Sequence, residues 1–177
     1  MPQFQEKSLF ETWPALRYVI YAIIALILSV LHVVFLNLIS VSSITPDLLL
    51  VLCVWISITE GQFIGIFAGF GCGLLFDVLS ADVLGTNALA KTLAAFVAGY
   101  FFKAKFTDQT IGSYKFIIAV FVCSMVHNLT YFFFFFRPTE ISFSGFFLKY
   151  GIASTLYTSV SAVFPMLIKA QKLTVRH

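Results

Sequence analysis

The sequence predicts an all-α membrane protein, a polytopic bundle of about six transmembrane helices in one domain. Of its 177 residues, 60% are hydrophobic and only 11% are charged, which is too apolar for an ordinary soluble globular domain. The apolar residues run on for about 20 positions at a time, the length of a membrane-spanning helix. A transmembrane β-barrel would instead show short segments of alternating polarity, so helices in a lipid bilayer are expected.

Two short segments flank the predicted membrane domain, which covers residues 17–168. Residues 1–16 are polar and are expected at the cytoplasmic membrane surface, where Trp13 and Arg17 suit the headgroup region. Residues 169–177 form a basic cytoplasmic tail. No cleavable signal peptide is expected, because the first apolar run begins late, lacks an A-x-A exit and is long enough to remain as an anchor.

The first two spans are predicted at residues 17–39 and 47–58. The polar stretch before Pro46 ends the first, because proline cannot continue a helix. Residues 47–79 as one helix would be about 50 Å long, well beyond a hydrocarbon core of about 30 Å. The chain must therefore fold back near Glu60. The resulting second span is short, so it tilts little, thins the membrane locally or sits partly inside the protein.

Four further spans follow, at residues 62–79, 84–102, 112–136 and 146–168. A basic connector, residues 103–108, separates the fourth span from the fifth. Arg137-Pro138 ends the fifth span, again because proline interrupts helical hydrogen bonding.

The distribution of basic residues predicts that both termini are cytoplasmic. With that orientation the inner side holds Lys7, Arg17, Lys103, Lys105, Lys115, Lys169, Lys172 and Arg176. The outer side holds only Arg137 and Lys149, as the positive-inside rule requires. A five-span topology would put the basic connector and the basic tail on opposite sides. The net charge of +3 therefore reflects membrane topology, and no nucleic-acid partner is expected.

A row of glycines marks the third span as a surface for close helix packing. Its members recur at every fourth position: Gly61, Gly65, Gly69 and Gly73. Residues four apart lie nearly above one another on an α-helix, so the row forms a smooth strip, which Ala68 and Gly71 widen. The packing helix can come from the same chain, from a second copy in a homodimer, or from another membrane protein.

Lys91 lies inside the fourth span and needs a partner. A charge within the bilayer costs about 2.5 to 3.5 kcal/mol, so this lysine should face protein or water. Asp77, at the outer end of the preceding span, is the predicted ion-pair partner, and Asp47 lies on the same outer side. The pair either clamps two helices or belongs to an outer interaction surface. No chain of ionisable groups crosses the membrane, which argues against an ion pathway.

His32, His127 and Asn128 are polar residues within predicted spans, also toward the outer side. Hydrogen bonds between helices are the favoured interpretation, because two histidines without an evident third ligand are a weak metal signal. The three cysteines, Cys53, Cys72 and Cys123, lie in apolar runs without a CxxC spacing and are predicted to be buried thiols. We therefore expect no metal and no cofactor.

Motifs of known catalytic chemistry do not appear in the sequence. It contains no Gly-rich phosphate loop, no HExxH, no GxSxG and no evident nucleophile–base pair. An intramembrane enzyme would need a paired acid and base or a metal triad. The sequence therefore predicts a protein without catalytic residues.

Three stretches resemble the MreD family of rod shape-determining proteins. They are Pro46-Asp47 at the entry of the second span, Gly73-x-x-x-Asp77-x-x-Ser80, and the following Leu84-Gly85. Length and hydropathy are similar along nearly the whole chain, whereas the motifs cover residues 46–89.

This resemblance implies a multi-pass protein of the bacterial inner membrane. It implies MreC as partner, a single-span protein with a large periplasmic part, within a complex that includes MreB, RodA and a transpeptidase. The chain would be a scaffold that helps control cell shape and peptidoglycan synthesis. On this hypothesis the glycine row and the outer carboxylates Asp47 and Asp77 hold a partner helix and its periplasmic start.

An alternative of another class is the substrate-binding component of an energy-coupling-factor vitamin transporter, which small six-helix chains also resemble. A polar outer mouth with His32, His127 and Asn128 suits such a pocket. Against it, no outer loop clusters aromatic and polar residues that would close over a ligand.

Overall fold

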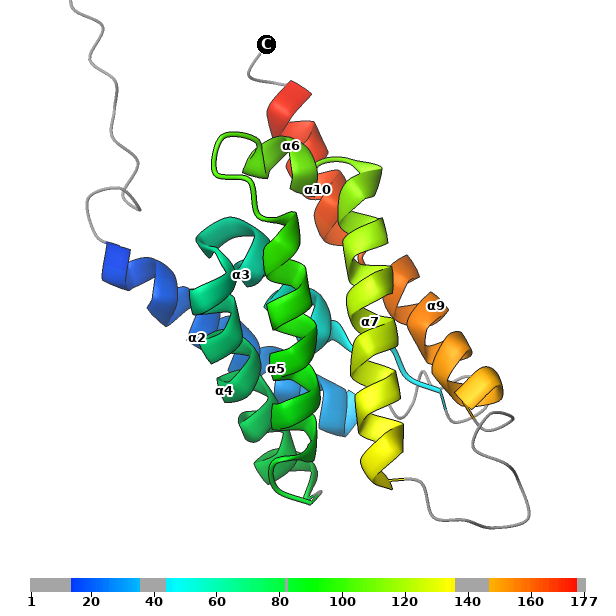
Figure 1. The fold of residues 1–177 in the computed structure, drawn as a ribbon. Helices are drawn as coiled ribbons and strands as arrows, with labels where there is room; N and C mark the ends of the chain where they lie inside the picture. Colours follow the sequence, from blue (N-terminus) through cyan, green and yellow to red (C-terminus); the bar gives the residue numbers. More distant parts are fainter. Residues whose placement is uncertain (1–13, 36–43, 82, 136–146, 175–177) are drawn as a thin grey trace, which may run out of the picture.

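The computed structural model describes residues 14–35, 44–81, 83–135 and 147–174, and the elements within them are helices (Figure 1). The all-α prediction is confirmed. Arg137, most of residues 1–16 and the end of the predicted first span lie outside the described residues. In chain order the elements are α2 (Pro14–Phe35), α3 (Leu48–Glu60), α4 (Gln62–Ser80), α5 (Thr86–Ala98), η2 (Gly99–Phe101), α6 (Thr107–Ile111), α7 (Tyr114–Phe135), η3 (Phe147–Gly151), α9 (Ile152–Ser161) and α10 (Val163–Thr174).

Four stretches are long and apolar enough to cross a membrane: Ala15–Val34, Gln62–Ser80, Tyr114–Phe134 and Phe147–Gln171. They agree with four of the predicted spans. The other two correspond to α3 and α5, each of 13 residues. Such helices are about 20 Å long, shorter than a hydrocarbon core of about 30 Å. The count of six spans and the cytoplasmic termini therefore stay predictions.

The short helix α3 lies at the centre of the bundle. It packs against α2, α4, α5, α6, α7 and α9. Its residues from Leu49 to Ile58 are buried except for the half-buried Trp55, so its apolar side chains face protein on every side. Gly61 ends α3 with a φ of +96°, a conformation that glycine adopts without strain, and α4 begins at the next residue. Of the three expectations for the second span, enclosure within the protein fits this arrangement.

Helices α4 and α5 form an antiparallel hairpin, and two members of the glycine row, Gly69 and Gly73, lie in its interface (Figure 1). A Cβ at Gly69 would lie 2.7 Å from the carbonyl oxygen of Lys91 and 2.9 Å from Cβ of Ala95. A Cβ at Gly73 would overlap the backbone of Ala88, and one at Gly65 would overlap Ser57 of α3. The row is thus occupied by helices of the same chain. The hypothesis that it receives a partner helix is wrong at these three glycines.

The C-terminal part is a helix in three segments, η3, α9 and α10, where the sequence predicts a single span. The break after α9 is at Ala162. Pro165 explains it, because this residue has no N–H to donate to the carbonyl of Ser161. The short α6 within residues 107–111 was also not predicted; its sequence carries no long apolar period.

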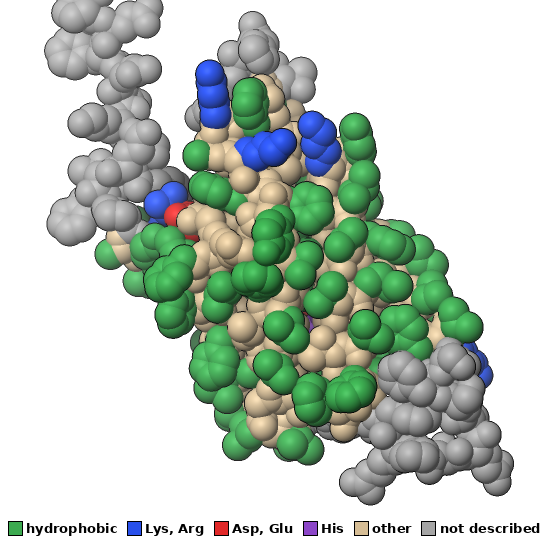
Figure 2. All heavy atoms as spheres, viewed as in Figure 1, with side chains coloured by type: hydrophobic (Ala, Val, Ile, Leu, Met, Phe, Trp, Pro, Cys, Tyr) green, Lys and Arg blue, Asp and Glu red, His purple; other side chains and the backbone are tan. Residues whose placement is uncertain are grey.

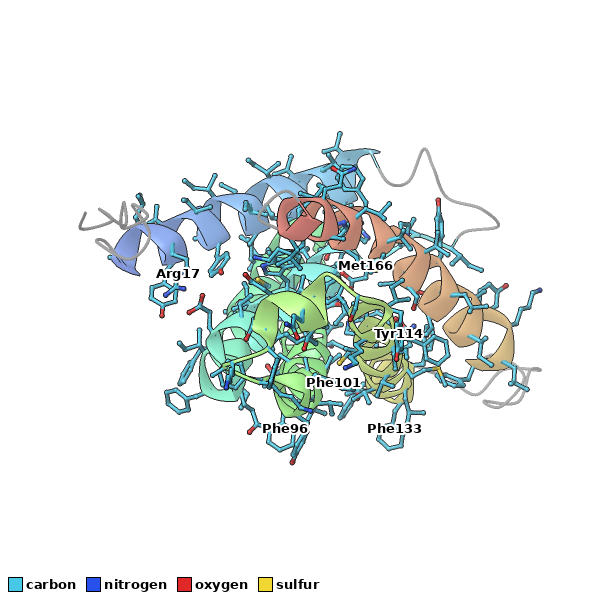
Figure 3. All side chains as sticks on the ribbon, turned by 90° about the horizontal axis from the view of Figure 1, so that it is seen from above. Arg17, Phe96, Phe101, Tyr114, Phe133 and Met166 are labelled. Carbon is cyan, nitrogen blue, oxygen red and sulfur yellow. The ribbon has the colours of Figure 1, made fainter. Side chains whose placement is uncertain are left out.

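The two ends of the bundle differ in charge. The α5–α6 connection, α6, the start of α7 and α10 gather at the upper end in Figure 1, and they carry Lys103, Lys105, Lys115 and Lys169. Figure 2 shows Lys and Arg side chains at that end and hydrophobic side chains over most of the face below. In the view of Figure 3, Phe96 of α5 and Phe133 of α7 point outward, as expected for side chains that face lipid.

The glycine contacts predict opposite outcomes for two substitutions in α4. Gly69→Leu should lower the free energy of unfolding by more than about 3 kcal/mol, because the new side chain meets backbone atoms of α5. Gly71→Leu should leave the fold intact, since a Cβ at Gly71 meets nothing within 4 Å. Thermal melting and size-exclusion profiles of the detergent-extracted variants would check both. Equal stability of the two variants would contradict the α4–α5 packing.

Candidate functional site

Lys91 forms an ion pair at the centre of the bundle, with Asp47. Its side chain is 1% exposed, and Nζ lies 2.6 Å from Oδ2 of Asp47. Nζ also lies 3.3 Å from Nε2 of His127 and 5.2 Å from the centre of the Phe76 ring. The predicted pairing of Lys91 with Asp77 is therefore wrong. Sequence proximity favoured Asp77, whereas the fold brings the start of α3 to the lysine.

Asp77 caps the neighbouring helix instead. Its carboxylate accepts hydrogen bonds from the backbone N–H groups of Gly85 (2.9 Å), Asn87 (3.2 Å) and Ala88 (3.2 Å). These groups belong to the start of α5, where helical N–H groups have no partner in their own helix. A fully buried carboxylate satisfied in this way holds the α4–α5 turn closed.

Asp47 uses each of its polar groups to fix the start of α3. Oδ1 accepts a hydrogen bond from the N–H of Leu50 (2.8 Å) and so caps the helix. The N–H of Asp47 donates to Oγ1 of Thr158 in α9 (3.0 Å), while Oδ2 receives Lys91. One residue thereby joins α3, α5 and α9.

His127 and Asn128 extend this cluster toward η3 and α9. An ammonium group only donates, so Nε2 of His127 accepts from Lys91, and the ring proton then lies on Nδ1, 3.4 Å from Oδ1 of Asn128. Nδ2 of Asn128 donates to the carbonyl of Gly151 (3.1 Å) and to Oγ1 of Thr155 (2.9 Å). The predicted hydrogen bonds between helices are confirmed for these two residues.

His32 lies beside this cluster, and its Nδ1 atom makes no hydrogen bond with the described residues. Its ring packs edge-on against Phe76, with centroids 4.8 Å apart. His32, Asp47, Asn87 and His127 line a cavity of about 380 Å³, together with the rings of Phe76, Tyr131, Phe132 and Tyr150. Nδ1 of His32 and Nδ2 of Asn87 are buried and lack a hydrogen-bond partner among the described residues. The cavity has room for about a dozen water molecules, which such groups would bind.

The polar groups of this cluster make structural contacts between helices of the chain. The carboxylate of Asp47, the ammonium of Lys91 and the imidazole of His127 contact one another. Among the described residues no group of three His, Cys, Asp or Glu side chains is placed to hold a metal ion. The three cysteines are buried and free of disulfides.

A second polar contact, at the other end of α3, was missed by the sequence reasoning. Oε1 of Glu60 forms an ion pair with Nη1 of Arg17 (3.0 Å) and accepts a hydrogen bond from the hydroxyl of Tyr21 (3.1 Å). Both partners belong to α2. Figure 3 shows Arg17 near the start of that helix. From the sequence, Glu60 was interpreted only as the position of a turn, and Arg17 only as a contact to lipid headgroups. Their separation along the chain hid the pairing.

An apolar groove lies between α2 and the exposed side of α4. It has a volume of about 380 Å³, and its lining combines small residues with Tyr18 and Phe67. The small residues are Ala22, Ala25, Ala68 and Gly71. Unlike the row at Gly65, Gly69 and Gly73, this strip of α4 is only partly covered: Ala68 packs against the buried cluster that contains Ala25 of α2, whereas Gly71 is exposed.

A family model described as rod shape-determining protein MreD matches residues 13–171. No curated protein and no solved structure matches the chain.

The ion pair predicts a strong energetic coupling between Asp47 and Lys91. Lys91→Met should cost about 3 kcal/mol of stability, because it leaves the mostly buried carboxylate of Asp47, 15% exposed, without its counter-ion. In a double-mutant cycle, Asp47→Asn and Lys91→Met should show a coupling of about 2 kcal/mol. Thermal or denaturant unfolding in detergent provides the four stabilities.

Asp77→Asn combined with Lys91→Met is the matched control. We expect a coupling below about 0.5 kcal/mol, because backbone N–H groups and not Lys91 satisfy Asp77. A larger coupling for Asp77 than for Asp47 would contradict the assigned pair.

Proposed function

The chain belongs to the MreD family of rod shape-determining proteins, and on that premise we propose that it is a non-catalytic scaffold of the bacterial cell-elongation complex. The family match places the chain among multi-pass membrane proteins involved in rod shape determination. Beyond this, we propose that it resides in the bacterial inner membrane, binds MreC, and with MreB, RodA and a transpeptidase helps direct peptidoglycan synthesis.

The use of the polar residues supports a scaffold role. Asp47, Asp77, Lys91, His127 and Asn128 are all engaged in contacts within the chain. These contacts fix α3, α5, α7 and α9 relative to one another, and a fixed relative position is what a scaffold needs in order to hold partners in register.

The hypothesis that outer carboxylates contact a partner directly needs revision. Asp77 is fully buried and accepts three backbone N–H groups, and Asp47 is occupied by Lys91 and by its own helix. Their contribution to partner binding is therefore indirect: they position the helices that a partner meets.

The groove between α2 and α4 is our proposed contact for the transmembrane helix of MreC. Ala22, Ala25, Ala68 and Gly71 line it, and small residues let a second helix approach closely. Gly71 is exposed and has open space where a side chain would lie, so the strip is free to receive a helix. A single-span partner has one such helix to offer, which fits one groove.

The alternative of a vitamin-binding transporter component is not supported. The family match concerns rod shape determination, and no comparison joins this chain to a transporter.

Gly71→Leu tests the groove. The substitution should reduce the recovery of MreC with the tagged chain by at least about tenfold, because the leucine side chain occupies the space into which the partner backbone would pack. Mass spectrometry of proteins co-purified from native membranes under mild detergent would measure it. The amount and melting temperature of the variant should match the unsubstituted chain.

Val78→Leu is the control, since Val78 is 62% exposed on the same helix and does not line the groove. Undiminished recovery of MreC with Gly71→Leu would reject this docking position. Absence of MreC from the unsubstituted chain, with recovery of paired cytoplasmic ATPases or of a second copy alone, would reject the proposed partner itself.

A further inference from the structure

A second cavity, of about 650 Å³, lies at the lysine-rich end of the bundle. It is bounded by η2, the connection after it, α6 and the first turn of α7. Its lining contains two lysines, Lys103 and Lys115, and the rings of Tyr100, Phe101 and Phe106. Tyr100 and Phe106 are 70% and 47% exposed, so the cavity opens to the surroundings of the bundle.

The two lysines bring uncompensated positive charge to this cavity. Within the described ranges neither has a carboxylate within ion-pair distance, although other cations do: Lys169 lies 2.7 Å from Asp108, and Arg17 pairs with Glu60. Lys115 is also the second residue of α7, a helix of 22 residues whose first N–H groups carry partial positive charge. The cavity therefore favours an anion with several acceptor oxygens.

An apolar groove adjoins this cavity along α7. Its volume is about 320 Å³, and Ile118 lines both spaces. The groove runs between α7 and α9, past Phe121 and Val160. Its one polar side chain, Ser159, donates its hydroxyl to the carbonyl of Thr155 and so has no unmet hydrogen bond. A cationic cavity and an apolar groove that share a residue fit an amphiphile with an anionic head and a hydrocarbon chain.

The position relative to the membrane selects the kind of amphiphile. The candidate membrane span of α7 begins at Tyr114. If α7 crosses the bilayer there, Lys115 lies at the membrane surface and the groove farther along α7 lies beside the hydrocarbon region. Basic pockets between transmembrane helices at this depth bind anionic lipid headgroups. We propose that an anionic phospholipid binds here, with its phosphate between Lys103 and Lys115 and one acyl chain along the α7–α9 groove.

Native mass spectrometry of the full chain, delipidated in detergent and then supplied with phosphatidylglycerol or phosphatidylcholine, tests the site. The unsubstituted chain should retain phosphatidylglycerol in preference to phosphatidylcholine. Lys103→Gln combined with Lys115→Gln should lower this retention by more than about tenfold, since each lysine near a headgroup contributes about fivefold. The matched control, Lys105→Gln with Lys149→Gln, removes the same charge outside the cavity and should change retention by less than about twofold.

A second variant distinguishes a lipid from a free anion. Ile118→Trp narrows the passage to the groove and should weaken phosphatidylglycerol retention, whereas millimolar inorganic phosphate should not displace the lipid. Displacement by phosphate together with unchanged retention in Ile118→Trp would show an anion site without a lipid chain and overturn the proposal. Equal losses in the two double-lysine variants would also overturn it, because binding would then follow total charge.

Discussion

The structure depends on a buried contact between the ammonium of Lys91 and the carboxylate of Asp47, 2.6 Å apart. A charge enclosed among apolar helices is stable only with a partner, and this requirement fixes where α3 begins relative to α5. Because Asp47 also caps α3 and donates its N–H to Thr158, the same residue sets the position of α9. His127 and Asn128 then carry the network from Lys91 to η3 and α9. A helix too short to span the membrane alone is held at the centre of the bundle in this way.

Close packing and polar contacts stabilise different parts of the α3–α4–α5 core. Gly65, Gly69 and Gly73 let α4 approach α3 and α5 to backbone contact, while Asp77 closes the turn by accepting the first N–H groups of α5. Both sets of contacts occupy surface that the sequence pattern had marked as a candidate contact for a partner. What remains for recognition is the opposite side of α4, facing α2, and the lysine-rich end. In the proposed scaffold role, an interior held by these contacts would give partners a constant arrangement of outer surfaces.

The helical class and four of the spans followed from hydropathy, because continuous apolar runs have one solution in a bilayer. The turn near Glu60 was predicted because a single helix over residues 47–79 would be longer than the hydrocarbon core is thick. The partner of Lys91 did not, because the sequence shows which residues are near along the chain, whereas Asp47 reaches the lysine only after α3 is enclosed. The glycine spacing predicted a close crossing without identifying the helix that makes it. The Arg17–Glu60 contact and the break before Pro165 likewise depend on neighbours that periodicity does not reveal.

Solid-state NMR in lipid bilayers would test the central contact most directly, by measuring dipolar coupling between ¹⁵N-labelled lysine Nζ and ¹³C-labelled aspartate carboxyl groups. We expect a short-range coupling that disappears in Asp47→Asn and persists in Asp77→Asn. The more exposed pair of Lys169 and Asp108 serves as an internal reference, which Asp108→Asn removes. A Lys91 coupling that disappears in Asp77→Asn and persists in Asp47→Asn would contradict the pairing of Lys91 with Asp47.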